Sequence, residues 1–136
     1  MPEAYQEIDH PADLAIKIHG NDLPSLFRHA AEGMFSLMRC EEGETADAHE
    51  QRVELEAVDL ETLLVDWLDE LLFLSEREQI CFDDYDIEVV EQSRLRATVY
   101  ARGGGRPHRG IKAVTYADMD IREVDTGYET VVTFDV

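Results

Sequence analysis

The most regular hydrophobic pattern in the chain lies in the segment 59–78, DLETLLVDWLDELLFLSERE. Its apolar residues recur with the i, i+3, i+4, i+7 spacing of one helix face. They are Leu60, Leu63, Leu64, Trp67, Leu68, Leu71 and Leu72. Asp59 is placed to cap the first turn with its side-chain oxygen, and Glu61 complements the positive end of a helix. We therefore predict a helix over 59–78 at the centre of the hydrophobic core.

A second helical pattern, LPSLFRHAAEGMFSLM, follows Asp22, which is a suitable N-cap. Alternating apolar and polar residues predict strands around the two helices. We expect strands at 4–8, 14–19 and 52–58, and hairpins at 85–101 and 113–136. Because helices and strands mix without strict βαβ alternation, the fold class is α+β. The 136 residues predict one domain, 1–136, with two main helices packed on a mainly antiparallel β-sheet.

Charge restricts the classes of partner. The chain has 31 acidic and 12 basic residues, which gives a formal net charge of −19. Such a field repels phosphate, and this argues against general nucleic-acid binding and against anionic membrane surfaces. It suits a basic protein partner or a bound cation, and an acidic proteome in a salt-adapted cell would give the same excess without functional meaning.

The two cysteines, Cys40 and Cys81, are too few and too isolated for a disulfide framework or a thiolate metal site, so we expect reduced, partly buried thiols. The segment MPEAYQEIDH lacks the basic and apolar regions of a secretory signal. No apolar run approaches the roughly 18 residues of a membrane span. These features predict a cytoplasmic protein.

Two acidic groups of residues are candidates for cation binding. Asp9, His10 and Asp13 lie directly before a predicted strand, and Asp135 and Val136 end the chain, where Val136 adds a terminal carboxylate. Carboxylate oxygens suit hard cations such as Ca²⁺ or Mg²⁺. The alternative is that the first group caps a turn and that the second is a frayed terminus.

A basic, glycine-rich segment, RGGGRPHRGIK, is the third candidate. Six of the twelve Lys and Arg residues lie between Arg94 and Lys112, a stretch without Asp or Glu. The loop would contact RNA phosphate, nucleotide phosphate or an acidic protein surface. The alternative is a hairpin loop whose arginines balance the acidic surface. The residues proposed for such contacts are Arg102, Arg106, His108, Arg109 and Lys112. No nucleophile and base stand in a recognisable catalytic setting, so we expect a protein that is not an enzyme.

Several motifs, in this order, resemble the archease family: DHPAD, LPSLFRHAAEGMFSLM, DLETLLVDWLDELLFL, IKAVTYADMDI and a final FDV. The resemblance covers nearly the whole chain. It implies a small, acidic, non-catalytic activator of the RtcB-type RNA ligase, which promotes guanylylation and multiple turnover of that enzyme in tRNA splicing or RNA repair. RNA would be reached through the ligase.

The resemblance also implies a divalent-cation site. The cation would be Ca²⁺, with Mg²⁺ and Mn²⁺ as alternatives, and its ligands would be Asp13, Asp135 and Val136. Asp9 and His10 would support these ligands or face the partner. Two positions depart from the family pattern: Pro11 stands where Thr is usual, and Ala117 stands where many members have His. The runner-up functions are a chaperone-like or RNA-binding module that uses the 102–112 loop, and a small metal-dependent hydrolase that uses Asp9, His10 and Asp13.

Overall fold

The computed structural model describes residues 4–8, 14–40, 49–91, 93–103, 105–115 and 119–136. This part of the chain contains two helices and eight strands, and its strand pairs are antiparallel. The α+β class and the antiparallel pairing are therefore confirmed. The described helices are not long and apolar enough to cross a lipid bilayer.

The strands form two sheets, where the sequence pattern predicted one. The larger sheet has the order β1-β2-β8-β6, and β7 also pairs with β8. Its strands are β1 (Tyr5–Ile8), β2 (Leu14–Gly20), β6 (Ala113–Thr115), β7 (Arg122–Val124) and β8 (Gly127–Asp135). The smaller sheet has the order β3-β5-β4, from β3 (His49–Glu56), β4 (Asp84–Glu91) and β5 (Arg94–Ala101). Pairing between distant strands separates the two sheets, and local alternation does not reveal it.

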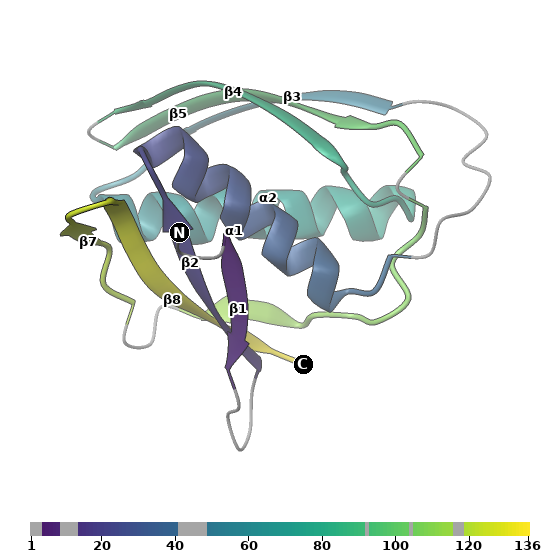
Figure 1. Ribbon diagram of the computed structural model, residues 1–136. Helices are drawn as coiled ribbons and strands as arrows, with labels where there is room; N and C mark the ends of the chain where they lie inside the picture. The colour runs from purple at the N-terminus through teal and green to yellow at the C-terminus, as the bar shows by residue number, and fades with distance from the viewer. Residues whose placement is uncertain (1–3, 9–13, 41–48, 92, 104, 116–118) are drawn as a thin grey trace.

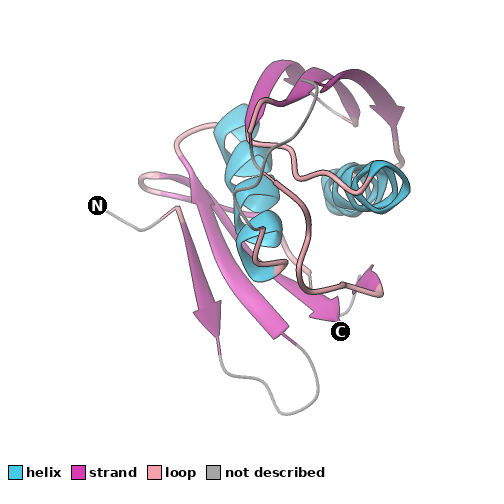
Figure 2. Cartoon of the chain, turned by 90° about the vertical axis from the view of Figure 1, so that its right-hand side faces the viewer, coloured by secondary structure: helices cyan, strands magenta, loops and turns pink. Residues whose placement is uncertain are grey.

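The helices α1 (Leu23–Leu37) and α2 (Leu60–Glu78) lie between the two sheets (Figures 1 and 2). Helix α1 packs against β2 and β4, while α2 packs against β3 and β6. Each helix therefore contacts both sheets, and one continuous core results.

Helix α2 confirms the prediction from the leucine pattern. Asp59 Oδ1 accepts a hydrogen bond from the backbone N–H of Thr62 at 2.8 Å, and the helix ends at Glu78, before Gln79 in the left-handed conformation. Trp67 is fully buried and its Nε1–H donates to the carbonyl oxygen of Phe27 at 2.9 Å. This bond satisfies the indole and ties α2 to α1.

Helix α1 begins as predicted after Asp22. The Asp22 carboxylate accepts a hydrogen bond from the backbone N–H of Ser25 at 2.8 Å, and this bond lowers the pKa of Asp22. On the outer side of α1, Arg28 Nη2 donates to the carbonyl oxygen of Tyr85 on β4 at 3.2 Å. The helix is therefore fastened to an edge strand of the smaller sheet.

The predicted hairpin at 85–101 is confirmed as β4–β5, and a second hairpin is formed by β7 and β8. In the range 113–124, for which a long strand was expected, the structure has strands at Ala113–Thr115 and Arg122–Val124, and the described residues 119–121 between them are not in a strand. Gly127 in the β7–β8 turn has a φ of +133°, and a Cβ there would overlap the carbonyl oxygen of Gly20. Only glycine fits this close approach.

The prediction of reduced cysteines is wrong for this structure. Cys40 and Cys81 form a disulfide, with a Cα–Cα distance of 6.2 Å and a separation of 41 residues in sequence. Cys40 follows the end of α1, and Cys81 lies between α2 and β4. The segment 105–109 bonds to both, because the Cys81 N–H donates to the carbonyl oxygen of Gly105 and the N–H groups of His108 and Arg109 donate to that of Met38. Spacing in the sequence gives no sign of this proximity.

Candidate functional site

The C-terminal end of β8 lies between the first residues of two neighbouring strands. Phe134 pairs with Leu14 on β2, and Asp135 pairs with Ala113 on β6. The Asp135 side chain is exposed, and the Asp135 carbonyl oxygen accepts a hydrogen bond from the Lys112 N–H at 2.7 Å. Sheet pairing thus brings the basic segment next to a predicted metal ligand.

Of the other residues predicted for this site, the described part of the chain contains Val136 alone. Val136 directly follows Asp135 and is 37% exposed. Asp9, His10 and Asp13 lie outside the described residues. Among the residues that the structure describes, no three His, Cys, Asp or Glu side chains gather as a metal site. The three-carboxylate site with Asp13, Asp135 and Val136 therefore stays a prediction.

Half of the predicted basic cluster is neutralised within the smaller sheet. Three arginines on or directly after β5 each form an ion pair with a carboxylate of a neighbouring strand. The N–O distances are 3.3 Å for Arg94–Glu56, 2.8 Å for Arg96–Glu88 and 3.7 Å for Arg102–Asp84. Arg102 also lies over the Tyr100 ring, with its Cζ 4.4 Å from the centroid. These arginines are paired with acidic residues of the same sheet, and Arg102 is the one among them that belongs to the segment RGGGRPHRGIK.

The second half of the cluster packs on the end of α1. The backbone N–H groups of His108 and Arg109 donate to the carbonyl oxygen of Met38, at 3.0 and 2.8 Å. In the described ranges, no carboxylate lies within ion-pair distance of Arg106, Arg109 or Lys112. These three cations remain candidates for contact with an anionic partner, whereas Arg102 already has a carboxylate partner.

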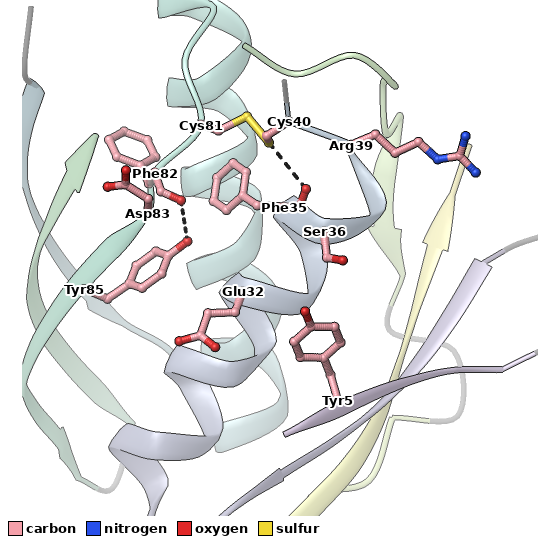
Figure 3. Close-up of a pocket in the computed structure, with 10 residues that line it drawn as sticks. All are labelled: Tyr5, Glu32, Phe35, Ser36, Arg39, Cys40, Cys81, Phe82, Asp83 and Tyr85. Carbon is pink, nitrogen blue, oxygen red and sulfur yellow. Dashed lines mark hydrogen bonds between the residues drawn. A yellow bond between two sulfur atoms is a disulfide. The ribbon is translucent and has the colours of Figure 1, made fainter. Parts of the chain in front are cut away.

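Sequence reasoning missed a pocket of about 480 Å³ between β1, α1 and the start of β4 (Figure 3). Its floor is aromatic, because Phe35, Phe82 and Tyr85 are each no more than 5% exposed. The Phe35 and Phe82 rings meet edge to face, with centroids 6.1 Å apart. The Cys40–Cys81 disulfide lines one side, and Cys40 Sγ lies 3.4 Å from the carbonyl oxygen of Phe35. Since the disulfide sulfur has no hydrogen to donate, this is a sulfur–oxygen contact.

The rim of the pocket is polar and consists of Tyr5, Glu32, Ser36, Arg39 and Asp83. The Tyr85 hydroxyl donates to the carbonyl oxygen of Phe82 at 2.7 Å. Burial raises the pKa of Tyr85 well above its usual value, and the charges of Glu32 and Asp83 raise it further. The phenol therefore stays neutral, and the pocket combines an aromatic floor with negative charge at its rim.

One sequence signal points towards the pocket. Glu32 and Ser36 are one helical turn apart and form a polar stripe outside the apolar face of α1, and Arg39 follows the end of the helix. The aromatic residues gave no such signal, because apolar residues at helix and strand positions are normally read as core. Only the fold places this stripe beside β1 and β4.

Comparison with known proteins identifies a family for these features. The model of the Archease protein family (MTH1598/TM1083) matches residues 5–136. Protein archease from Methanosarcina acetivorans is 31% identical over 140 residues, which cover 97% of this chain and 95% of the relative.

Two solved structures are similar in fold. The solution structure of Methanobacterium thermoautotrophicum protein 1598 has a TM-score of 0.77 and 33% identity, and it covers 98% of this chain and 99% of its own. The crystal structure of an archease, a possible chaperone, from Thermotoga maritima has a TM-score of 0.64 and covers 96% of each chain. At 24% identity the second likeness concerns the fold alone.

Proposed function

The chain belongs to the archease family, and on this premise we propose that it is a non-catalytic activator of an RtcB-type RNA ligase in the cytoplasm. In this role it promotes guanylylation of the ligase and its multiple turnover during tRNA splicing or RNA repair. RNA is reached through the ligase, since a net charge of −19 opposes direct binding to phosphate. The same charge favours rapid docking on a basic, RNA-binding enzyme.

The observation that carries the proposal is the position of Asp135. It ends β8, and the register beside it pairs Phe134 with Leu14. Asp13 directly precedes Leu14 in the sequence, and this neighbourhood supports the proposal that Asp13, Asp135 and Val136 share one cation. Asp9 and His10 would support these ligands or face the ligase.

The donor set fits a hard divalent cation, for which we propose Ca²⁺, with Mg²⁺ or Mn²⁺ as alternatives. The Asp135 side chain is exposed and therefore accessible to a cation. All the proposed donors are carboxylate oxygens, the ligands that such cations prefer. A bound cation would offset the repulsion between these carboxylates and fix them as a group. The backbone carbonyl of Asp135 is already used by the Lys112 N–H, so we assign the side chain as the ligand.

The experiment measures guanylylation and multiple-turnover RNA ligation by the cognate ligase, with and without this protein. We expect stimulation by the natural chain and its loss in Asp135→Asn, which keeps the size of the side chain but removes its charge. Asp86→Asn is the matched control, because Asp86 is exposed on β4, away from the proposed ligands. Calorimetric titration of each variant with CaCl₂ reads out the cation site independently of the ligase.

Each part of the proposal has its own opposing result. Absence of stimulation by the natural chain would overturn the activator role. Stimulation by Asp135→Asn equal to that of the natural chain would remove Asp135 from the mechanism. A variant extended beyond Val136 tests the terminal carboxylate in the same way, because the extension moves that carboxylate away from Asp135.

A further inference from the structure

The pocket between β1, α1 and β4 has the features of a preformed binding site. Phe35, Phe82 and Tyr85 form a floor whose rings are held by core packing. The Tyr85 hydroxyl is bonded to the Phe82 carbonyl oxygen, and the Cys40–Cys81 disulfide joins the two chain segments beside the rings. Only a small part of each ring residue, 5% or less, is exposed, and its position is fixed before a ligand enters, which lowers the entropic cost of binding.

Two carboxylates stand at the rim without a cationic partner. In the described part of the chain, no Lys, Arg or His nitrogen lies within ion-pair distance of Glu32 or Asp83. Asp83 is held in place, because its Oδ1 accepts the Arg102 N–H at 3.0 Å. The Glu32 side chain reaches from α1 towards Tyr85, whereas the Arg39 side chain extends away from both carboxylates (Figure 3).

The nearest arginine on the same helix is engaged elsewhere. Arg28 precedes Glu32 by one helical turn, and its Nη2 donates to the Tyr85 carbonyl oxygen at 3.2 Å. This bond holds the wall of the pocket and leaves Glu32 unneutralised. The rim therefore presents negative charge over aromatic rings, a combination that attracts a cation with a flat, weakly hydrated surface.

We propose that this pocket binds an arginine side chain presented by a partner protein. The N–H groups of the planar guanidinium can donate to Glu32 and Asp83, while its weakly hydrated face lies against the apolar floor. The lysine ammonium is compact and strongly hydrated, so it makes poorer use of the aromatic floor. A bare metal ion would find only two carboxylates and no further charged donor in the floor. The identity of the partner rests on the proposed function: the arginine belongs to the RNA ligase.

The first experiment tests the pocket without any partner. The chain is titrated with N-acetyl-arginine amide, and the backbone amide shifts of Phe82, Asp83 and Tyr85 are followed by NMR. N-acetyl-citrulline amide has nearly the same shape without the charge. We expect saturable shifts with the arginine probe and at least about fivefold weaker binding of the citrulline probe. The double variant Glu32→Gln/Asp83→Asn should lose the preference for arginine.

The matched control removes the same charge elsewhere. Glu50→Gln/Asp86→Asn changes two exposed residues of β3 and β4 and should keep the preference for arginine. Asp83→Asn retains an oxygen for the Arg102 N–H, so the fold should persist, and thermal unfolding checks this. Equal binding of arginine and citrulline, equal losses in both double variants, or tighter binding of N-acetyl-lysine amide would each overturn the proposal.

The second experiment measures the affinity of the same variants for the ligase. We expect Glu32→Gln/Asp83→Asn to bind the ligase about tenfold more weakly than the control double variant. If the Glu32→Gln/Asp83→Asn variant binds the ligase as tightly as the control and stimulates ligation as well as the natural chain, the arginine does not come from the ligase. If the natural chain neither binds nor stimulates the ligase, the proposed function fails, and the arginine probe still decides whether the pocket is a site.

Discussion

The exposed stripes of α1 and α2 have the same helical spacing but different surroundings. On α2, Phe73 is 56% exposed, and Arg77 of the same helix lies over its ring, with a distance of 5.4 Å from Cζ to the centroid. On α1, the stripe with Glu32 and Ser36 lines a pocket whose floor is aromatic. The α2 stripe thus supplies its own arginine for its aromatic ring, whereas the α1 stripe leaves this place open to another molecule.

The elements packed around an exposed helix stripe decide whether it lines a pocket. Both stripes arise because one face of each helix enters the core and the other does not. Helix α1 lies beside the edge strands β1 and β4, and residues of these strands form the sides of the pocket next to its stripe. The same local spacing places an arginine over an exposed ring in one helix and lines an aromatic pocket in the other.

The largest expected effect separates the buried and exposed faces of α2. Leu68 is fully buried, so Leu68→Ala should lower the free energy of unfolding by about 2–5 kcal/mol. Phe73→Ala on the exposed stripe should cost less than about 1 kcal/mol, since it loses mainly the contact with Arg77. Urea denaturation measures both. A similar cost for the two variants would contradict the division of α2 into a core face and a surface face.

The second effect concerns the disulfide, which joins the segment after α1 to the segment between α2 and β4. The bond closes a loop between residues 41 positions apart, so Cys40→Ser/Cys81→Ser should cost about 2–4 kcal/mol. Unfolding with and without a reducing agent measures the effect. The natural chain should lose stability on reduction, and the double serine variant should not respond. Two free thiols in the purified natural chain would contradict the disulfide.

A smaller effect concerns the first turn of α1. Asp22→Ala should destabilise the protein by about 0.5–2 kcal/mol, and Asp22→Asn by less, because Asn also caps helices. The hydrogen bond from Ser25 lowers the pKa of Asp22 in the folded state. Its contribution is therefore present above the usual carboxyl pKa of 3.8 and is lost as the pH falls through the lower folded value. Measured against pH, the free energy of unfolding of Asp22→Asn should therefore fall less in acid than that of the natural chain.

The smallest expected effect is a gain in stability, and it concerns Asp69 of α2. Partial burial raises the pKa of Asp69 above 3.8, and the charge of Asp66 adds to this. Stability linked to Asp69 is therefore full below its unfolded pKa and is lost as the pH rises through the folded pKa. We expect Asp69→Asn to be slightly more stable than the natural chain at pH 7 and to lose this advantage in acid. Lower stability of Asp69→Asn at pH 7 would contradict it.

The sequence predicts the elements of this fold better than their assembly. The leucine spacing and the Asp59 cap define α2 almost to the residue, because both signals are local. The two hairpins follow from alternation and turns for the same reason. The separation into two sheets depends on the pairing of β8 with β2 and with β6. Strands β2 and β8 are more than a hundred residues apart in the sequence, so local patterns carry no information on their pairing.

The candidate sites show the same limit. The sequence predicts Asp135 as a metal ligand, and only the strand pairing shows that Lys112 lies beside it. The cluster of basic residues appeared uniform in sequence, but ion pairs to neighbouring strands divide it. The pocket and the disulfide were not foreseen, because each joins the end of α1 to the segment before β4 through contacts that have no sequence periodicity.

The hydrogen bond from Arg28 to Tyr85 also bears on how the protein behaves at high concentration. A strand at the edge of a sheet is a template on which a second chain can add and begin aggregation. Arg28 occupies a carbonyl oxygen of the edge strand β4, and α1 lies along that edge. The opposite edge, β3, exposes charged side chains, including Glu50 and Glu54. Covering one edge and charging the other protects the smaller sheet against growth into a larger, intermolecular one.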